Sequence, residues 1–168
     1  LFPAALLALG VAGIGLAAGV SAASPTLDTI RATGVITFGY RDNAVPFAFK
    51  DREGRVRGYS VELCTRVAGS IQKELGLSEL KIEWLPVEAS NRLDYVVDGK
   101  VDAVCGTTTI TLSRMKKVDF SLPIYVDGGS VLVRAKSKFA RLADLKDKRI
   151  AVISGTTTEE DLVSGLNA

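Results

Sequence analysis

The segment Gly34-Val-Ile-Thr-Phe-Gly-Tyr40 decides the fold, because its apolar and β-branched composition predicts a strand, the first in an alternating order of strands and helices. Residues 41–57 contain a proline and a charged turn, which predicts a loop or a short hairpin. Beyond it, six apolar residues recur at spacings of three and four, as on one face of a helix. They are Val61, Cys64, Val67, Ala68, Ile71 and Leu75. Ser60 is the predicted N-cap of this helix, and Gly76 suits its end.

Two further strands follow along the chain. Residues 80–85 alternate between apolar and polar side chains, and residues 101–105 form a short apolar run. Between them, Ser90 or Asn91 can cap a short helix. The order strand, helix, strand, helix, strand favours a parallel sheet with helices on both faces. Ligands of such sheets bind beyond the carboxyl ends of the strands.

Polar residues stand at each of these carboxyl ends. Arg41 follows the first strand, Ser90-Asn-Arg92 follows the second, and Gly106-Thr-Thr-Thr109 leads from the third to Arg114. A guanidinium is a planar fork that matches a carboxylate. We therefore expect three arginines and a hydroxyl-rich turn to meet at one rim and to bind an anion.

A second unit is predicted after a flexible break at Asp127-Gly-Gly129. We assign residues 24–125 to a first lobe and residues 126–168 to the start of a second lobe, which we expect to be incomplete within these 168 residues. The second lobe should contain strands at 130–134 and 149–154, a helical turn at 142–145 and a helix that opens near Thr157. The turn Gly155-Thr-Thr157 before that helix should offer unpaired N–H groups to an anion.

The composition excludes several kinds of site. With no histidine, the chain has no Ser-His-Asp or Cys-His catalytic set and no histidine-ligated metal, and two cysteines cannot fill a four-ligand zinc site. A net charge of +2 gives no reason to expect nucleic acid as a partner. We predict no metal, no cofactor and no catalytic residue.

The first residues differ from the rest of the chain. No charge occurs before Asp28, and the run from Ala4 to Val20 consists of Ala, Leu, Gly, Val and Ile. Small residues at 20–24 suit a cleavage site after Ala22 or Ala23. We interpret residues 1–23 as a signal peptide, with an uncleaved membrane anchor as the alternative.

Both cysteines are expected near the rim of the first lobe. Cys64 lies near the start of the first predicted helix and Cys105 at the end of a strand. A disulfide fits an oxidising compartment, and two buried free thiols are the alternative.

Four segments together carry a resemblance to a known family over roughly residues 27–168. They are residues 58–68 (GYSVELCTRVA), 105–114 (CGTTTITLSR), 118–121 (VDFS) and 145–157 (LKDKRIAVISGTT). In order and spacing they resemble the extracellular solute-binding proteins of polar amino-acid ABC transporters, family 3. The family more often has an acidic residue where this chain has Ser60. Residues 40–47 and 90–92 look most like the glutamate/aspartate-binding branch.

The resemblance implies a fold and roles for individual residues. The fold is α/β and similar to type II periplasmic binding proteins, with two hinged lobes built on mostly parallel sheets. Arg114 would grip the ligand α-carboxylate, and Arg41 and Arg92 would hold a side-chain carboxylate. The remaining ligand contacts would come from Ser90, Thr107, Thr109, Thr156 and Thr157. The acidic partner of the α-ammonium in the family falls beyond Ala168.

The function that this resemblance implies is periplasmic binding of a polar, acidic amino acid, without catalysis, by a monomer that delivers the ligand to a membrane permease. One alternative is an enzyme on the same fold, similar to cyclohexadienyl dehydratases or lytic transglycosylases. It would need a general acid, for which Glu88 is the candidate near the rim. The other alternative is the sensing lobe of a membrane receptor.

Overall fold

The structure, a computed structural model, describes residues 24–167. The predicted signal peptide, residues 1–23, lies outside the described residues, so this prediction remains open. Within residues 24–167, none of the helices combines the length and the apolar character needed to cross a membrane.

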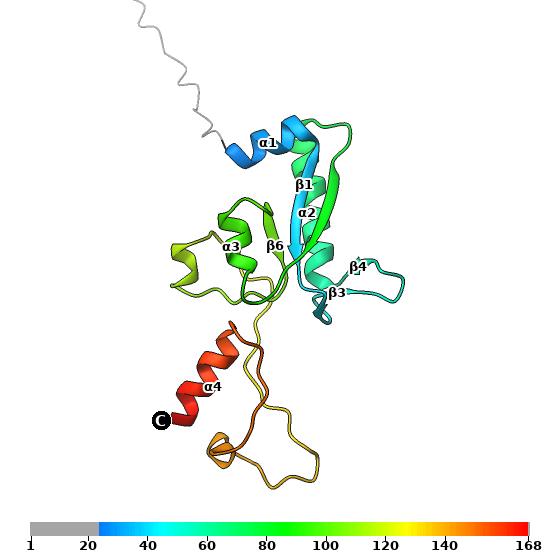
Figure 1. The fold of residues 1–168 in the computed structure, drawn as a ribbon. Helices are drawn as coiled ribbons and strands as arrows, with labels where there is room; N and C mark the ends of the chain where they lie inside the picture. The colour runs from blue at the N-terminus through cyan, green and yellow to red at the C-terminus, as the bar shows by residue number, and fades with distance from the viewer. Residues whose placement is uncertain (1–23, 168) are drawn as a thin grey trace, which may run out of the picture.

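A three-stranded parallel sheet organises the first part of the chain (Figure 1). Its central strand is β1 (Val35–Tyr40), flanked by β5 (Lys81–Pro86) and β6 (Ala103–Cys105). The register pairs Tyr40 with both Pro86 and Cys105, so the carboxyl ends of the three strands lie level. The predicted parallel α/β sheet is confirmed.

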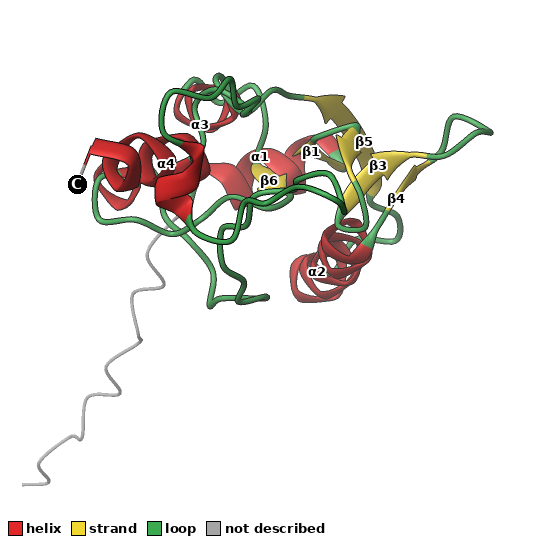
Figure 2. Cartoon of the chain, turned by 90° about the horizontal axis from the view of Figure 1, so that it is seen from below, coloured by secondary structure: helices red, strands yellow, loops and turns green. Residues whose placement is uncertain are grey.

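The helices pack against this sheet, and Figure 2 shows α2 (Tyr59–Leu75) and α3 (Arg92–Val97) on opposite sides of it. The main core joins α1 (Pro25–Thr33), β1 and α2 through Ile30, Ile36, Phe38 and Ala68. The sequence reasoning missed α1. Its signals are Pro25 in the first turn and Gly34 in the left-handed conformation that ends it.

The predicted N-cap of α2 is wrong. The cap is Gly58, and Ser60 is a buried residue inside the first turn. A β-carbon on Gly58 would lie 2.3 Å from the carbonyl oxygen of Phe47, so only glycine fits there. The Ser60 hydroxyl instead donates a hydrogen bond of 3.0 Å to the Gly106 carbonyl, which fastens α2 to the end of β6.

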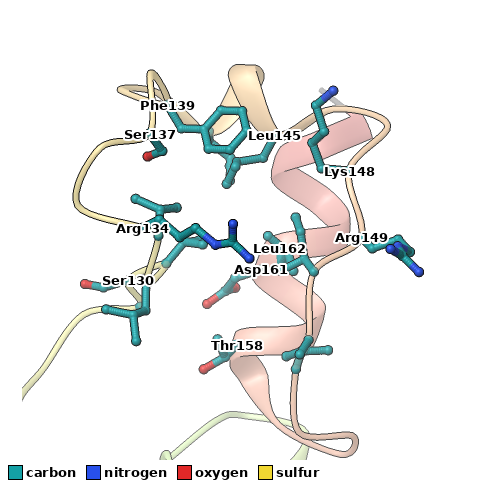
Figure 3. A pocket seen from close by; sticks show the side chains of 18 residues that line it. Ser130, Arg134, Ser137, Phe139, Leu145, Lys148, Arg149, Thr158, Asp161 and Leu162 are labelled. Carbon is teal, nitrogen blue, oxygen red and sulfur yellow. The ribbon is translucent and has the colours of Figure 1, made fainter.

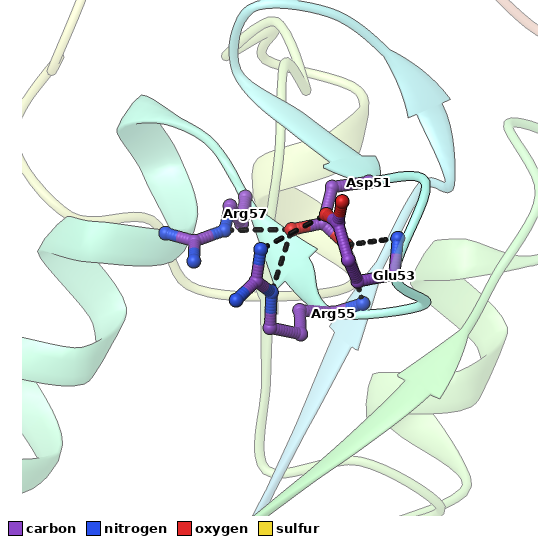
Figure 4. A network of polar contacts seen from close by, with 4 residues as sticks. All are labelled: Asp51, Glu53, Arg55 and Arg57. Atoms are coloured by element: carbon purple, nitrogen blue, oxygen red, sulfur yellow. Dashed lines mark hydrogen bonds and ion pairs between the residues drawn. The ribbon is translucent and has the colours of Figure 1, made fainter.

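The segment predicted as a loop or hairpin is a small antiparallel sheet of β2 (Asn43–Ala44), β3 (Ala48–Lys50) and β4 (Val56–Arg57). Asp51 holds its tip (Figure 4): its carboxylate accepts hydrogen bonds from the Arg55 backbone N–H and from the guanidinium groups of Arg55 and Arg57. Partial burial would raise the pKa of Asp51, but these three donors outweigh it and hold that pKa well below its ordinary value.

Three helical segments follow among the later described residues; in Figure 1 the first, in yellow-green, lies beside α3, and the other two lie beyond the carboxyl ends of the sheet. They are the short 3-10 helices η1 (Arg114–Lys116) and η2 (Leu142–Leu145), and α4 (Thr157–Asn167). The predicted helical turn and the predicted helix near Thr157 are confirmed. The lobe boundary near residue 125 stays a prediction.

The strands predicted at 130–134 and 149–154 are wrong for the described residues, where neither segment has a ladder partner. Apolar side chains of both are exposed, as with Leu132 at 99% and Ile153 at 54%. A strand needs a hydrogen-bonded neighbour, and these two segments instead line opposite sides of a hollow of about 700 Å³ in front of α4 (Figure 3).

Candidate functional site

Three arginines from separate parts of the chain lie near enough for their charges to interact. Arg41 follows β1, Arg92 begins α3, and Arg114 begins η1. Their proximity shows in the pKa of Arg92, which burial lowers to about 10, with further lowering by the positive charges of Arg114 and Arg41. We call these three residues the arginine cluster.

Arg92 is the buried member of the cluster, with an exposed fraction of 5%. Its Nε donates to the Thr108 hydroxyl at 2.8 Å, and its Nη1 donates to the Ala89 carbonyl. Both acceptors are neutral. These contacts orient the guanidinium but leave its charge uncompensated, which is costly for a buried cation unless an anion binds beside it.

The cluster has no carboxylate partner among residues 24–167. The ion pairs of that part of the chain all involve other basic residues, such as Arg55 and Lys81. Arg41 donates from Nη2 to the Asn43 side-chain oxygen at 3.1 Å, while its buried Nε has no acceptor. A buried donor without an acceptor is rare in folded proteins, and an anion beside Arg41 would satisfy it.

Arg114 connects the first part of the chain with the predicted second lobe. Its Nη1 donates to the Thr109 carbonyl at 2.9 Å, and its Nη2 donates to the Gly155 carbonyl at 3.4 Å. A second hydrogen bond between these two parts of the chain, of 3.2 Å, joins the hydroxyls of Thr109 and Thr157. Thr109 and Arg114 at the predicted rim therefore lie beside the start of α4.

The remaining predicted ligand residues differ in their exposure and contacts. Ser90 and Thr107 are exposed, and the Ser90 backbone lies against Gly155. The Thr156 hydroxyl donates to the Ile153 carbonyl at 2.7 Å and so stays within its own turn.

The prediction that the Gly155 turn offers free N–H groups is wrong for Gly155 itself. Its N–H donates to the Glu159 carboxylate at 2.9 Å, and the Glu159 N–H donates back to the Thr156 hydroxyl. The Thr156 hydroxyl thus caps the N–H of the acidic residue three positions along, and the carboxylate of that residue binds the N–H of the preceding Gly155, a variant of the capping box. The spacing Thr156-x-x-Glu159 was visible in the sequence and would have indicated it.

Sequence reasoning also missed two residues that shape the site. Thr108 orients Arg92, and Ser60 ties the turn after β6 to α2. Neither contact has a sequence signal, because their partners are 16 and 46 positions away. A disulfide between Cys64 and Cys105 ties the start of the same turn to α2 as well.

Aromatic rings hold the connection between the two parts of the chain. The ring of Phe47 lies 6.1 Å from that of Tyr59 and 4.9 Å from that of Tyr125, measured between centroids. The Tyr59 hydroxyl donates to the Ile124 carbonyl at 3.0 Å. These contacts dock residues 124–125 on the first part of the chain.

The hollow in front of α4 is separate from the arginine cluster. Its lining is mainly apolar and includes Val131, Phe139 and Leu162, and none of the three clustered arginines lines it (Figure 3).

The sequence matches one protein family and several curated proteins of known name. The sequence model of the bacterial extracellular solute-binding proteins, family 3, matches residues 36–165. The glutamate/aspartate import solute-binding protein of Escherichia coli K12 is 36% identical over 138 residues, which are 82% of this chain and 46% of that protein. The L-glutamate/L-aspartate-binding protein of Pseudomonas aeruginosa is 39% identical over 144 residues, 85% of this chain and 47% of that protein.

A solved structure shows the same architecture. It is an ancestral amino acid-binding protein described as a precursor of cyclohexadienyl dehydratase, with a TM-score of 0.76 and 36% identity over 84% of this chain and 61% of that one. The chain spans about half the length of the curated relatives it matches.

Proposed function

Because the chain belongs to the bacterial extracellular solute-binding proteins of family 3, we propose that it is the solute-binding component of an amino-acid ABC transporter and that it binds glutamate or aspartate. The ligand would lie between two lobes, beyond the carboxyl ends of β1, β5 and β6. A membrane permease would receive it, and the protein would act in the periplasm as a monomer.

The arginine cluster is the observation that carries this proposal. Three cations with no carboxylate partner among residues 24–167 require anionic charge, and an acidic amino acid supplies two carboxylates on one small molecule. Hydrogen bonds to charged groups contribute about 1.5–3 kcal/mol each. Several of them account for the roughly −8 kcal/mol of a micromolar ligand.

The contacts support a division of roles within the cluster. Arg114 lies next to both Thr109 and Gly155, so it would hold the α-carboxylate, which every amino acid has, between the two lobes. Arg41 and Arg92 would hold the side-chain carboxylate. Ser90, Thr107, Thr109, Thr156 and Thr157 would complete the polar lining.

Binding, rather than catalysis, is the activity we propose. The names of the two curated relatives above describe solute binding, and that of the solved neighbour describes amino acid binding. Turnover of prephenate or arogenate would support the enzyme alternative instead.

The test is titration calorimetry with a panel of amino acids on the protein expressed from its full reading frame. We expect heat from L-glutamate or L-aspartate and little from lysine or leucine. Arg66→Ala, which removes an exposed arginine on α2, serves as the control and should bind as the wild type does. Binding of neutral or basic amino acids alone would contradict the acidic-ligand proposal.

A further inference from the structure

The two predicted lobes touch at a backbone contact where a side chain would be crowded. Gly155, directly before the turn that opens α4, has φ +74°, and a β-carbon built on it would lie 3.3 Å from the Ser90 Cα and 3.4 Å from the Ala89 carbonyl oxygen. Ala89 and Ser90 precede α3 and belong to the first lobe. Both partner atoms are backbone atoms, which cannot rotate away as a side chain could.

This contact stands directly beside the site. The Ala89 carbonyl accepts from Arg92, and the Gly155 carbonyl accepts from Arg114. The Thr109–Thr157 bond crosses between the lobes next to it. The separation of Gly155 from Ser90 therefore determines how closely the Thr156–Thr157 turn approaches the arginine cluster.

We propose that Gly155 is a positioning residue whose missing side chain sets the closing distance of the two lobes, and hence the affinity for the ligand. This rests on the proposed function, because it assigns to both lobes contacts with one small molecule. A side chain at position 155 would meet the Ser90 backbone before the lobes reach the separation seen here. Contacts made from α4 to the ligand would then lengthen while those from Arg41 and Arg92 stay.

The test compares Gly155→Ala and Gly155→Val with Gly76→Ala. Gly76 also has a positive φ, of +67°, but a β-carbon on it would meet nothing within 4 Å. The control therefore carries the same backbone strain without the contact. L-glutamate affinity is measured by calorimetry, and lobe separation by pulsed electron paramagnetic resonance between spin labels at Ser70 on α2 and Val163 on α4, in the protein expressed from its full reading frame.

We expect Gly155→Ala to weaken L-glutamate binding by about tenfold, the usual scale of overpacking a tight contact. Gly155→Val should weaken it further, and both should shift the label distances to longer values with the far-ultraviolet circular dichroism unchanged. Gly76→Ala should leave affinity and distances at wild-type values.

The outcomes separate this inference from the proposed function. If wild-type protein fails to bind any acidic amino acid while Gly155→Val still lengthens the label distances, the proposed ligand is wrong and the role of Gly155 stands. If wild-type protein binds L-glutamate and Gly155→Val gives the same distances and affinity, the positioning role is overturned. Equal losses in Gly155→Ala and Gly76→Ala would also overturn it, because backbone strain alone would then explain them.

Discussion

Removing the disulfide between Cys64 and Cys105 should destabilise the protein and loosen the turn that orients the arginine cluster. The bond joins α2 to the end of β6, and the residues are 41 positions apart. In the loop-entropy description, a crosslink over that separation raises the free energy of the unfolded chain by about 4 kcal/mol. The turn that begins at Gly106 contains Thr108, which orients Arg92, so ligand affinity should fall as well.

The assay is urea unfolding of the wild type and of the variant with both cysteines changed to serine, followed by tryptophan fluorescence. Trp84 is the single tryptophan of the chain, and its ring lies 5.3 Å from that of Phe38 in the core, measured between centroids. Calorimetry with L-glutamate on the same samples measures the effect on the site. Wild-type protein treated with a reductant should behave like the double variant, and the reductant should not change the double variant itself.

The disulfide would have neither role if the double variant unfolded at the same urea concentration as the wild type and bound L-glutamate equally well. Two alkylatable thiols in the unfolded, non-reduced wild type would rule out the disulfide itself.

Further predictions concern the charged residues. Arg114→Ala should abolish calorimetric binding of every amino acid in the panel, because all of them carry an α-carboxylate. Arg41→Ala should weaken L-glutamate by about 10- to 150-fold, the loss of one charge-assisted interaction, and leave any L-glutamine binding nearly unchanged; equal losses for both ligands would contradict that division. The Arg92 guanidinium should titrate near pH 10 in ¹³C NMR spectra of the ligand-free protein, and the signal should be missing in Arg92→Lys. Because burial lowers the pKa of Arg92 and so disfavours its charged form in the folded state, the free energy of unfolding should rise as pH increases above about 10. The pKa of Asp51 is lowered in the folded protein, so its carboxylate should stabilise the tip of the β2–β3–β4 sheet fully above pH ~4 and lose this effect as pH falls towards its folded-state pKa. Hydrogen exchange of the Arg55 amide should report this loss, and Asp51→Asn should remove the pH dependence of that exchange.

The strands and helices of the parallel sheet could be predicted because their patterns are local. Apolar alternation identified β5, and the three-and-four spacing identified α2. The segments at 130–134 and 149–154 have the same local pattern and form no strand among residues 24–167. Composition shows that a segment suits a strand, but only a hydrogen-bonded neighbour makes it one.

That the three arginines lie near one another could be predicted from the sequence, but how they are held could not. The level carboxyl ends of the strands bring Arg41 and Arg92 towards each other once the parallel order is known. The roles of Ser60 and Thr108 depend on hydrogen bonds across 46 and 16 positions, which no periodicity reveals. The close approach at Gly155 likewise follows from how two backbones pack, which a sequence does not show.

A crystal structure of the protein expressed from its full reading frame, grown with L-glutamate, would show whether the three arginines bind the two carboxylates of the ligand. We predict the α-carboxylate in hydrogen-bond contact with Arg114 and the side-chain carboxylate between Arg41 and Arg92. Density for L-glutamate at another place, with no carboxylate oxygen within hydrogen-bond distance of any of the three guanidinium groups, would contradict it.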